Sequence, residues 1–147
     1  MVEHFIQRYL SGLSTVTDDL STYTFETGAA EAPAIFTEET FPQDYTLPAI
    51  IISPIPGSVP FGCRDARGAE FLYDIEIYVP RATSRKTLRR LAKSVWLSLD
   101  RADLKDLVAE DGWDECGCFA DAPVPTDKKG FPGRRIACRI RLMEQVT

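Results

Sequence analysis

The sequence predicts an α+β fold, in which a mostly antiparallel (mixed) β-sheet carries two main packed helices and long projecting hairpin loops. Residues 2–13 and 83–99 show helical spacing of apolar residues, whereas 70–79, 113–120 and 134–143 alternate as strands do. Strand–loop–strand pairs joined by Pro- and Gly-rich segments favour antiparallel hairpins over a doubly wound sheet. The length of 147 residues suits one domain spanning 1–147.

The first helix is predicted from a single apolar face, and Gly12 and Ser14 mark its end. That face consists of Val2, Phe5, Ile6, Tyr9, Leu10 and Leu13. Residues 21–25 and 34–37 can form short strands, with a loop at 28–33 between them. A polar stretch, 38–46, follows and contains Pro42.

The central strands flank a segment that we expect to be a long projecting loop. Residues 49–52 are a short apolar run typical of a buried strand. Residues 54–68 contain three prolines and three glycines, which disfavour a helix or an inner strand. The strand 70–79 then places one set of residues toward the core and the opposite set outward: Leu72, Asp74, Glu76 and Tyr78.

The second helix is expected to begin at a Thr83 or Ser84 cap. Its apolar face comprises Leu88, Leu91, Ala92, Val95, Trp96 and Leu99, and its basic face Arg85, Lys86, Arg89, Arg90 and Lys93. Further helical turns are expected at 102–109, and a second long loop at 122–133. The last strand turns Ile136, Cys138, Ile140 and Leu142 inward and Arg135, Ala137, Arg139 and Arg141 outward.

Charge is unevenly distributed in this acidic chain, whose net charge is -5. An acidic domain is a poor candidate for sequence-independent DNA binding, which depends on Lys and Arg. Residues 1–50 hold eight acids and one base, whereas residues 81–101 hold seven bases and one acid. This contrast permits head-to-tail pairing between copies, although a basic helix face can equally be a solvated surface.

No motif for catalysis stands out. The single histidine, His4, lies beside the apolar stripe of the first helix, and no nucleophile elbow or phosphate-binding Gly motif is present. The cysteines at 63, 116, 118 and 138 could form a zinc site, but the spacing of 116 and 118 is atypical and buried cysteines are common. With no secretory signal or membrane-spanning run, reduced cysteines are expected.

Asp74 and Glu76 share one strand face, as a carboxylate pair can in a glycosidase. We expect their neighbours to be Arg139 and Arg141 on the last strand, and such opposite charges explain the pair without catalysis. A face charged in both signs is also suited to contact between subunits.

The order of elements resembles that of the tail terminator proteins (tail-completion, tail-to-head joining) of long-tailed bacteriophages. The resemblance covers about 1–143 and rests on the first helix, the 47–52 and 68–79 strands, the basic capped helix 83–99 and the Arg-rich strand 134–142. Residues 14–46 depart from it, since they are longer and more acidic than the family pattern.

The resemblance implies a structural virion protein and not an enzyme, with no cofactor or metal. Family members form a ring, commonly of six subunits, which caps the tail tube, stops its growth and joins it to the head. The implied partners are further copies of the chain, the tail tube protein, the head–tail connector or neck proteins, and the sheath if the tail is contractile. DNA passes through the lumen without specific binding, and the protein is assembled in the host cytoplasm and found at the tail–neck junction, away from membranes.

On this hypothesis, Asp74, Glu76, Arg85, Arg89, Lys93, Arg135, Arg139 and Arg141 are candidates for the ring interface. The projecting loops at 55–67 and 122–132 would reach neighbouring subunits or rings. Two alternatives remain: another neck component, such as a head-completion or connector protein or the cap of a contractile device, and a small cysteine-based metal-binding module.

Overall fold

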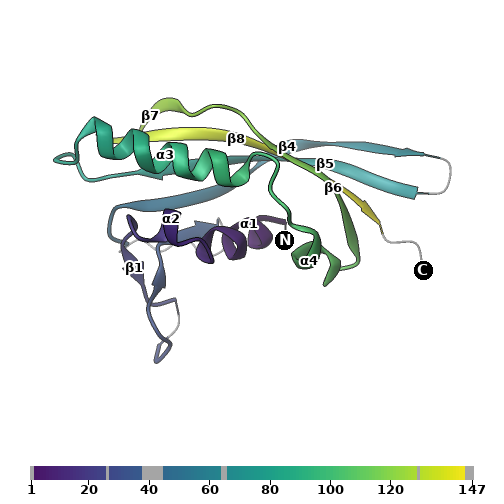
Figure 1. Cartoon of the computed structure of the whole chain (residues 1–147), viewed down its shortest axis with the longest axis horizontal. Helices are drawn as coiled ribbons and strands as arrows, with labels where there is room; N and C mark the ends of the chain where they lie inside the picture. Colours follow the sequence, from purple (N-terminus) through teal and green to yellow (C-terminus); the bar gives the residue numbers. More distant parts are fainter. Residues whose placement is uncertain (1, 26, 38–44, 64–65, 129, 145–147) are drawn as a thin grey trace.

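The computed structural model describes residues 2–25, 27–37, 45–63, 66–128 and 130–144, which form a mixed α+β structure (Figure 1). Helices and strands follow one another as α1 Val2–Ser11, α2 Ser14–Thr17, β1 Thr22–Tyr23, β2 Ala32–Pro33, β3 Ile35–Thr37, β4 Ala49–Cys63, β5 Ala66–Tyr78, α3 Arg85–Leu99, α4 Lys105–Ala109, β6 Trp113–Ala120, β7 Val124–Lys128 and β8 Phe131–Glu144.

Within these residues, the main sheet has six strands in the order β3-β4-β5-β8-β6, and β7 pairs with β8. Only β3 runs parallel to its neighbour, β4, whereas the other pairs are antiparallel. The two edges are therefore β3 on one side and β6 with β7 on the other. The predicted mixed, mostly antiparallel sheet is confirmed.

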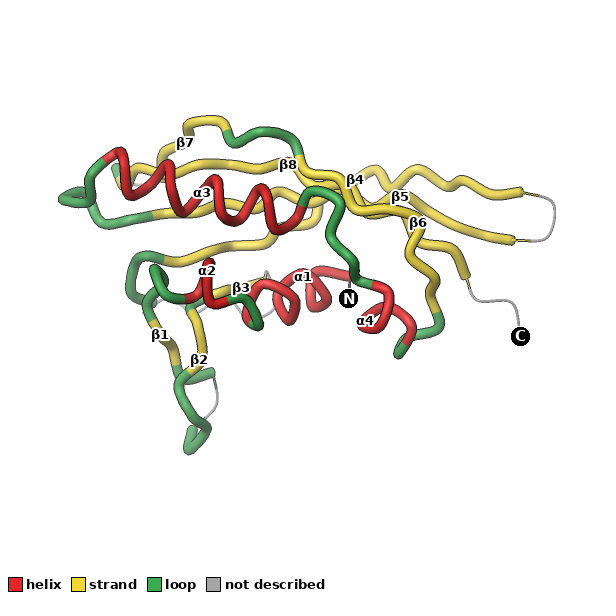
Figure 2. Tube along the Cα trace, in the orientation of Figure 1, coloured by secondary structure: helices red, strands yellow, loops and turns green. Residues whose placement is uncertain are grey.

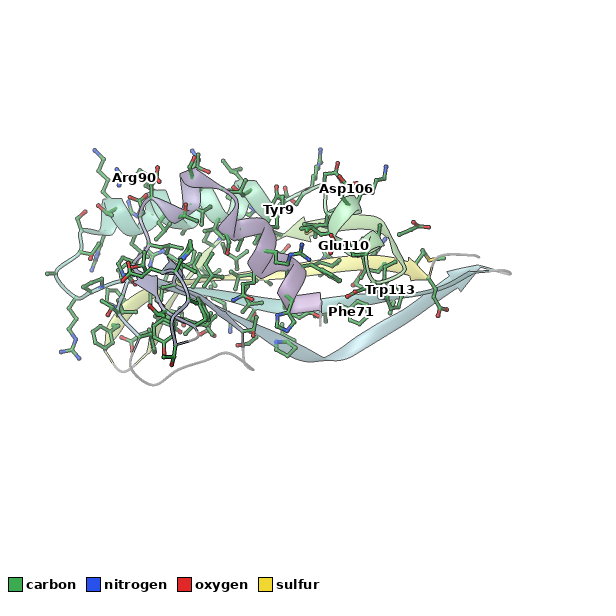
Figure 3. All side chains as sticks on the ribbon, turned by 90° about the horizontal axis from the view of Figure 1, so that it is seen from below. Tyr9, Phe71, Arg90, Asp106, Glu110 and Trp113 are labelled. Atoms are coloured by element: carbon green, nitrogen blue, oxygen red, sulfur yellow. The ribbon has the colours of Figure 1, made fainter. Side chains whose placement is uncertain are left out.

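The helices lie on one side of the sheet, and the core fills the space between (Figure 3). The predicted face of α1 buries Phe5, Ile6 and Leu10. The predicted face of α3 buries Leu88, Leu91, Ala92, Val95 and Leu99 against inward residues of β5 and β8. Because β5 alternates in a period of two, its remaining side chains point to the opposite side of the sheet.

The cap of α3 is Ser84, whose hydroxyl oxygen accepts a hydrogen bond from the Thr87 N–H at 3.2 Å. This interaction satisfies one of the backbone donors that a helix start leaves unpaired. The helical turns expected at 102–109 are α4, with Leu104 and Val108 buried.

The prediction of a loop at 54–68 is wrong, because β4 and β5 continue through it as the two strands of a long hairpin (Figure 2). β3 pairs only with Ile50–Ile52, so β4 beyond this point has β5 as its sole described neighbour. Proline has no backbone N–H to donate, and it is tolerated on an edge strand because the N–H groups on the free side have no partner strand to bond. A register shift between Ile55 and Val59 accommodates the irregular stretch.

The prediction of a second long loop at 122–133 is also wrong in part. Residues 124–128 are β7, and β8 already begins at Phe131. Gly130 lies in the connection with a φ of 80°, a conformation that suits glycine.

A separate aromatic cluster covers one end of the other side of the sheet. The buried residues Ala34, Phe36 and Ala49 pack there against Tyr23, Phe25, Tyr45 and Leu47. The Phe36 ring lies 5.4 Å from that of Tyr23 and 5.5 Å from that of Tyr45. The short β1–β2 pair extends from the body beside this cluster (Figure 2).

Candidate interaction surfaces

The side of the sheet turned away from the helices, here called the outer face, carries charges of both signs on β5 and β8. Directly paired residues of two strands share a face, so the register determines which side chains meet. The pairs on the outer face are Glu70 with Arg141, Leu72 with Arg139, Asp74 with Ala137, and Glu76 with Arg135.

Two ion pairs lie on this face, one between β5 and β8 and one between β8 and the residue after β6. The Arg141 Nε lies 2.6 Å from Glu70 Oε2, and the side chains are 50% and 16% exposed respectively. The Arg139 Nη2 lies 3.9 Å from Asp121 Oδ1 in a more open pair. The Arg141 guanidinium also lies 6.0 Å from the centre of the Phe119 ring on β6. Phe119 is 37% exposed, so an apolar ring stands among these charges.

Asp74 lies in the middle of the outer face and is partly buried. Burial raises the pKa of its carboxyl group, the nearby Arg135 charge opposes this shift, and the Glu76 charge adds to it. Because the pKa is raised on balance, the attraction of Arg135 offsets the lost hydration only in part, and ionisation of Asp74 costs free energy in the isolated subunit.

The Tyr78 side chain holds the Glu76 carboxylate in place. Its hydroxyl donates a hydrogen bond to Glu76 Oε2 at 2.7 Å, and its ring is buried. Burial, followed by the hydrogen bond and charge of Glu76, raises the pKa of the Tyr78 hydroxyl. The Glu76 carboxylate is therefore held at the border between the aromatic cluster and the charged part of the outer face.

The predicted neighbours of Asp74 and Glu76 need correction. All four side chains lie on the outer face as expected, but Arg139 stands opposite Leu72 and Arg141 opposite Glu70. Arg135 is the arginine paired with Glu76. The sequence gives the face of each residue, whereas the register depends on how the two strands are aligned.

The three candidates on α3 belong to a different surface, on the helix side of the sheet. Arg85, Arg89 and Lys93 are exposed, and Arg89 and Lys93 line a groove of about 360 Å³ between α3 and the β7–β8 pair. We call it the basic groove; its lining is Arg89, Lys93, Trp96, Pro123, Pro125 and Arg134, with Ala92 beneath. The structure thus divides the eight predicted interface residues between two sides of the subunit.

The groove is held in shape by a contact at Trp96. The indole Nε1–H donates a hydrogen bond to the Ala120 carbonyl at 3.0 Å, while the Ala120 N–H donates to Asp100 Oδ1 at 3.2 Å. These bonds tie the end of α3 to the end of β6. The ring of Trp96 is consequently fixed at the groove with part of its surface exposed.

A second hollow of about 370 Å³ lies where the end of α3 meets β6. It is lined by Arg101, Ala102, Asp103, Lys105, Gly117, Cys118 and Phe119. Arg101 has a φ of 60°, and its N–H donates to the Cys118 carbonyl at 2.7 Å. That bond holds the chain in the left-handed conformation which turns it from α3 toward α4.

Two of the cysteines are core residues. The Sγ atoms of Cys118 and Cys138 lie 3.8 Å apart, and each residue is 1% exposed. The proposed four-cysteine site also involves Cys63 and Cys116, whose side chains lie outside the described part of the structure. Among the described residues, no group of three or more His, Cys, Asp or Glu side chains could hold a metal ion.

Sequence reasoning missed Glu70 on the outer face and Trp96, Pro123, Pro125 and Arg134 in the basic groove. The spacing of Arg89, Lys93 and Trp96 along α3 could have shown that these three share a side of the helix. Nothing local shows that two prolines and an arginine from other strands close the groove, because that proximity arises from tertiary packing.

No family model and no curated protein matches the chain. Among the described residues, no helix has the length and apolar character needed to cross a membrane.

Proposed function

We propose that this chain is a structural subunit that forms a ring, most simply of six copies, capping a phage tail tube and joining it to the head. The ring stops tube growth, and its partners are the tube protein, the connector or neck proteins and, in a contractile tail, the sheath. It lies at the tail–neck junction of the virion, DNA passes through without specific binding, and the chain acts as a scaffold without catalysis or a cofactor.

One observation carries the proposal: the subunit has different charged surfaces on its two sides. The outer face presents acidic and basic groups around an exposed ring, and the helix side presents a basic groove. A ring contact between identical subunits is heterologous, and it requires two different surfaces of this kind.

The long β4–β5 hairpin supports the same proposal. Its tip extends beyond the rest of the sheet (Figure 1), and β8 accompanies β5 as far as Gly68. Beyond Ile52, β4 is the outer strand of this part of the sheet among the described residues, and such an edge strand leaves a row of backbone groups available for pairing. Contact with an adjacent subunit or ring would give this hairpin its packing partner.

The test is assembly of the purified protein, followed by negative-stain microscopy and by light scattering, alone and with the tail tube protein. We expect closed rings. The double variant Arg139→Glu, Arg141→Glu should weaken assembly, whereas Arg8→Glu should not. Arg8 is a matched control because it forms an exposed pair, 2.9 Å from Glu110, between α1 and α4. Monomers under both conditions would contradict the proposal.

A particle-level experiment separates the tail terminator from another neck component. Loss of the gene should leave tails of uncontrolled length that fail to join heads. Normal tails together with heads that cannot retain DNA would assign the chain to the head side of the joint. Normal virions would show that the chain is not a neck protein.

A further inference from the structure

The helix side of the subunit carries opposite charges at its two ends. The first part of α3, residues 85–93, holds five bases and no acid. The segment from the start of α4 to the start of β6, residues 105–114, holds four acids and one base, and we call it the acidic end. Figure 3 shows the two groups far apart along the helix layer, with Arg90 toward one end and Asp106 and Glu110 toward the other.

The basic groove carries charges that its own subunit does not neutralise. Arg89 and Lys93 are exposed, and among the described residues neither has an ion-pair partner. By contrast, Arg90 on the same helix lies 3.5 Å from Asp19. The Trp96 ring and two prolines add apolar surface beside the two free cations. The groove therefore suits a partner that brings carboxylates together with a small apolar side chain.

The helix α4 presents this combination. Asp106 and Glu110 are exposed and stand four positions apart, so both lie on one side of the helix. Arg89 and Lys93 have the same spacing on α3, so the two charged pairs match in separation as well as in sign. Ala109 is exposed beside the two acids, and its small side chain allows them to approach an aromatic ring closely.

The acidic end cannot occupy the groove of its own subunit. Val108 is fully buried, and Glu110 pairs with Arg8 of α1 at 2.9 Å, so α4 is held against the body. This pair balances only one of the four acids. Ten helical positions, from Arg89 to Leu99, correspond to about 15 Å, and α4 lies further on in the same direction (Figure 1). Only another copy of the chain can bring the two surfaces together.

We propose that the acidic end of one subunit binds in the basic groove of the next copy of the chain. The inference rests on the proposed self-assembly and names the contact that directs it. Carboxylates of the acidic end, that of Asp106 among them, pair with Arg89 and Lys93, while Ala109 packs against the Trp96 ring. Because the contact joins two different surfaces, it is heterologous and can repeat around a closed ring. The outer face stays available for the other contacts of the assembly.

Charge exchange between two variants tests the contact. Arg89→Glu with Lys93→Glu reverses the groove, and Asp106→Lys with Asp111→Lys reverses the acidic end without touching the pair between α1 and α4. Each variant alone should fail to assemble. An equal mixture should recover, because every groove then meets an end of opposite charge, and a chain with all four changes should recover too.

Two controls make charge changes of the same size elsewhere. Arg85→Glu with Lys86→Glu alters α3 outside the groove lining, and Asp18→Lys with Glu31→Lys alters exposed acids outside the acidic end. Both should leave assembly intact. Circular dichroism confirms that each variant is folded.

A second measurement does not depend on ring formation. One chain carries a neutral groove, Arg89→Gln with Lys93→Gln, and the other a neutral end, Asp106→Asn with Asp111→Asn. In a mixture, only one groove and one end of opposite charge remain, so sedimentation velocity should show one-to-one pairs, whereas each chain alone stays monomeric. A chain with all four neutral changes should bind either partner about tenfold or more weakly, and added salt should weaken the pairs.

The outcomes separate this contact from the proposed function. Rings that form normally from both charge-reversed variants, or neutral variants that do not pair, would overturn the docking and leave the ring proposal standing. Pairs that require both the groove and the acidic end, in a protein that forms no ring even with the tail tube protein, would support the docking and remove the ring.

Discussion

Tyr78 and Gly133 are directly paired across β5 and β8, and the Tyr78 ring occupies the space that a side chain at position 133 would need. A β carbon on Gly133 would lie 2.6 Å from the Tyr78 ring and 2.6 Å from the Ile77 carbonyl oxygen. The ring lies over the glycine and places its hydroxyl on Glu76 at 2.7 Å. A residue without a side chain on one strand thereby determines the position of an acid on the outer face.

Gly133→Ala should destabilise the subunit by about 1–3 kcal/mol, the usual cost of forcing extra atoms into a packed site. The backbone oxygen of Ile77 cannot move aside as a flexible side chain could. Denaturant unfolding measures the loss. Gly12→Ala is the matched control, because a β carbon there meets no atom closer than 3.6 Å. Equal stability of the two variants would contradict this account of the Tyr78–Gly133 contact.

Tyr78→Phe removes the donor to Glu76 and should lower the free energy of unfolding by about 1–3 kcal/mol at neutral pH, as expected for a hydrogen bond to a charged group. The effect should also depend on pH. Because the folded-state pKa of Tyr78 is raised above its ordinary value of 10.0, its contribution is present below pH 10 and is lost as the pH rises further. The variant should therefore lose less stability than the wild type between pH 9 and about 11.5, measured by urea unfolding. If the free energy of unfolding changed with pH equally in the variant and the wild type, the Tyr78 hydroxyl would not be held in its neutral form.

Asp74→Asn should stabilise the isolated subunit at neutral pH. Burial raises the pKa of Asp74 above its ordinary value of 3.8, so the folded state holds the proton more tightly than the unfolded state. Ionisation therefore costs folding free energy, and stability falls as the pH rises through the folded pKa. The advantage of the variant should disappear when the pH is lowered below the ordinary range of aspartate. Thermal melts from pH 3 to 7 follow this convergence; an advantage that persists at low pH would assign the effect to packing.

Cys118 and Cys138 should react with thiol reagents only after unfolding. Both are 1% exposed, and the hydrogen bond between the Cys138 and Cys118 thiols, followed by burial, raises the pKa of the Cys138 thiol, so that little thiolate forms there. The measurement is the rate of iodoacetamide labelling against denaturant concentration in a Cys63→Ser, Cys116→Ser background. Rapid labelling in the absence of denaturant would show that the strands β6 and β8 open locally.

The sequence by itself determined the elements that carry strong local patterns. The face of α1 from Phe5 to Leu10, the Ser84 cap and the inward residues of β8 all follow from spacing and local hydrogen bonding, which act over a few residues. The same alternation placed Asp74, Glu76 and Arg135 on one face of the sheet. The sequence pattern was misleading at 54–68, where the proline content indicated a loop. The strand there has a free edge, at which the backbone N–H of a residue needs no partner in the sheet, so proline is tolerated.

Tertiary structure decided which of these residues meet. Strand register paired Arg141 with Glu70 in place of the acids at 74 and 76, and it brought Gly133 under Tyr78. Packing of α3 against β7 and β8 created the basic groove from residues as distant as Arg89 and Arg134. The physical reason is that local periodicity fixes the direction of a side chain, whereas its partner is set by the alignment and packing of segments that are remote in the chain.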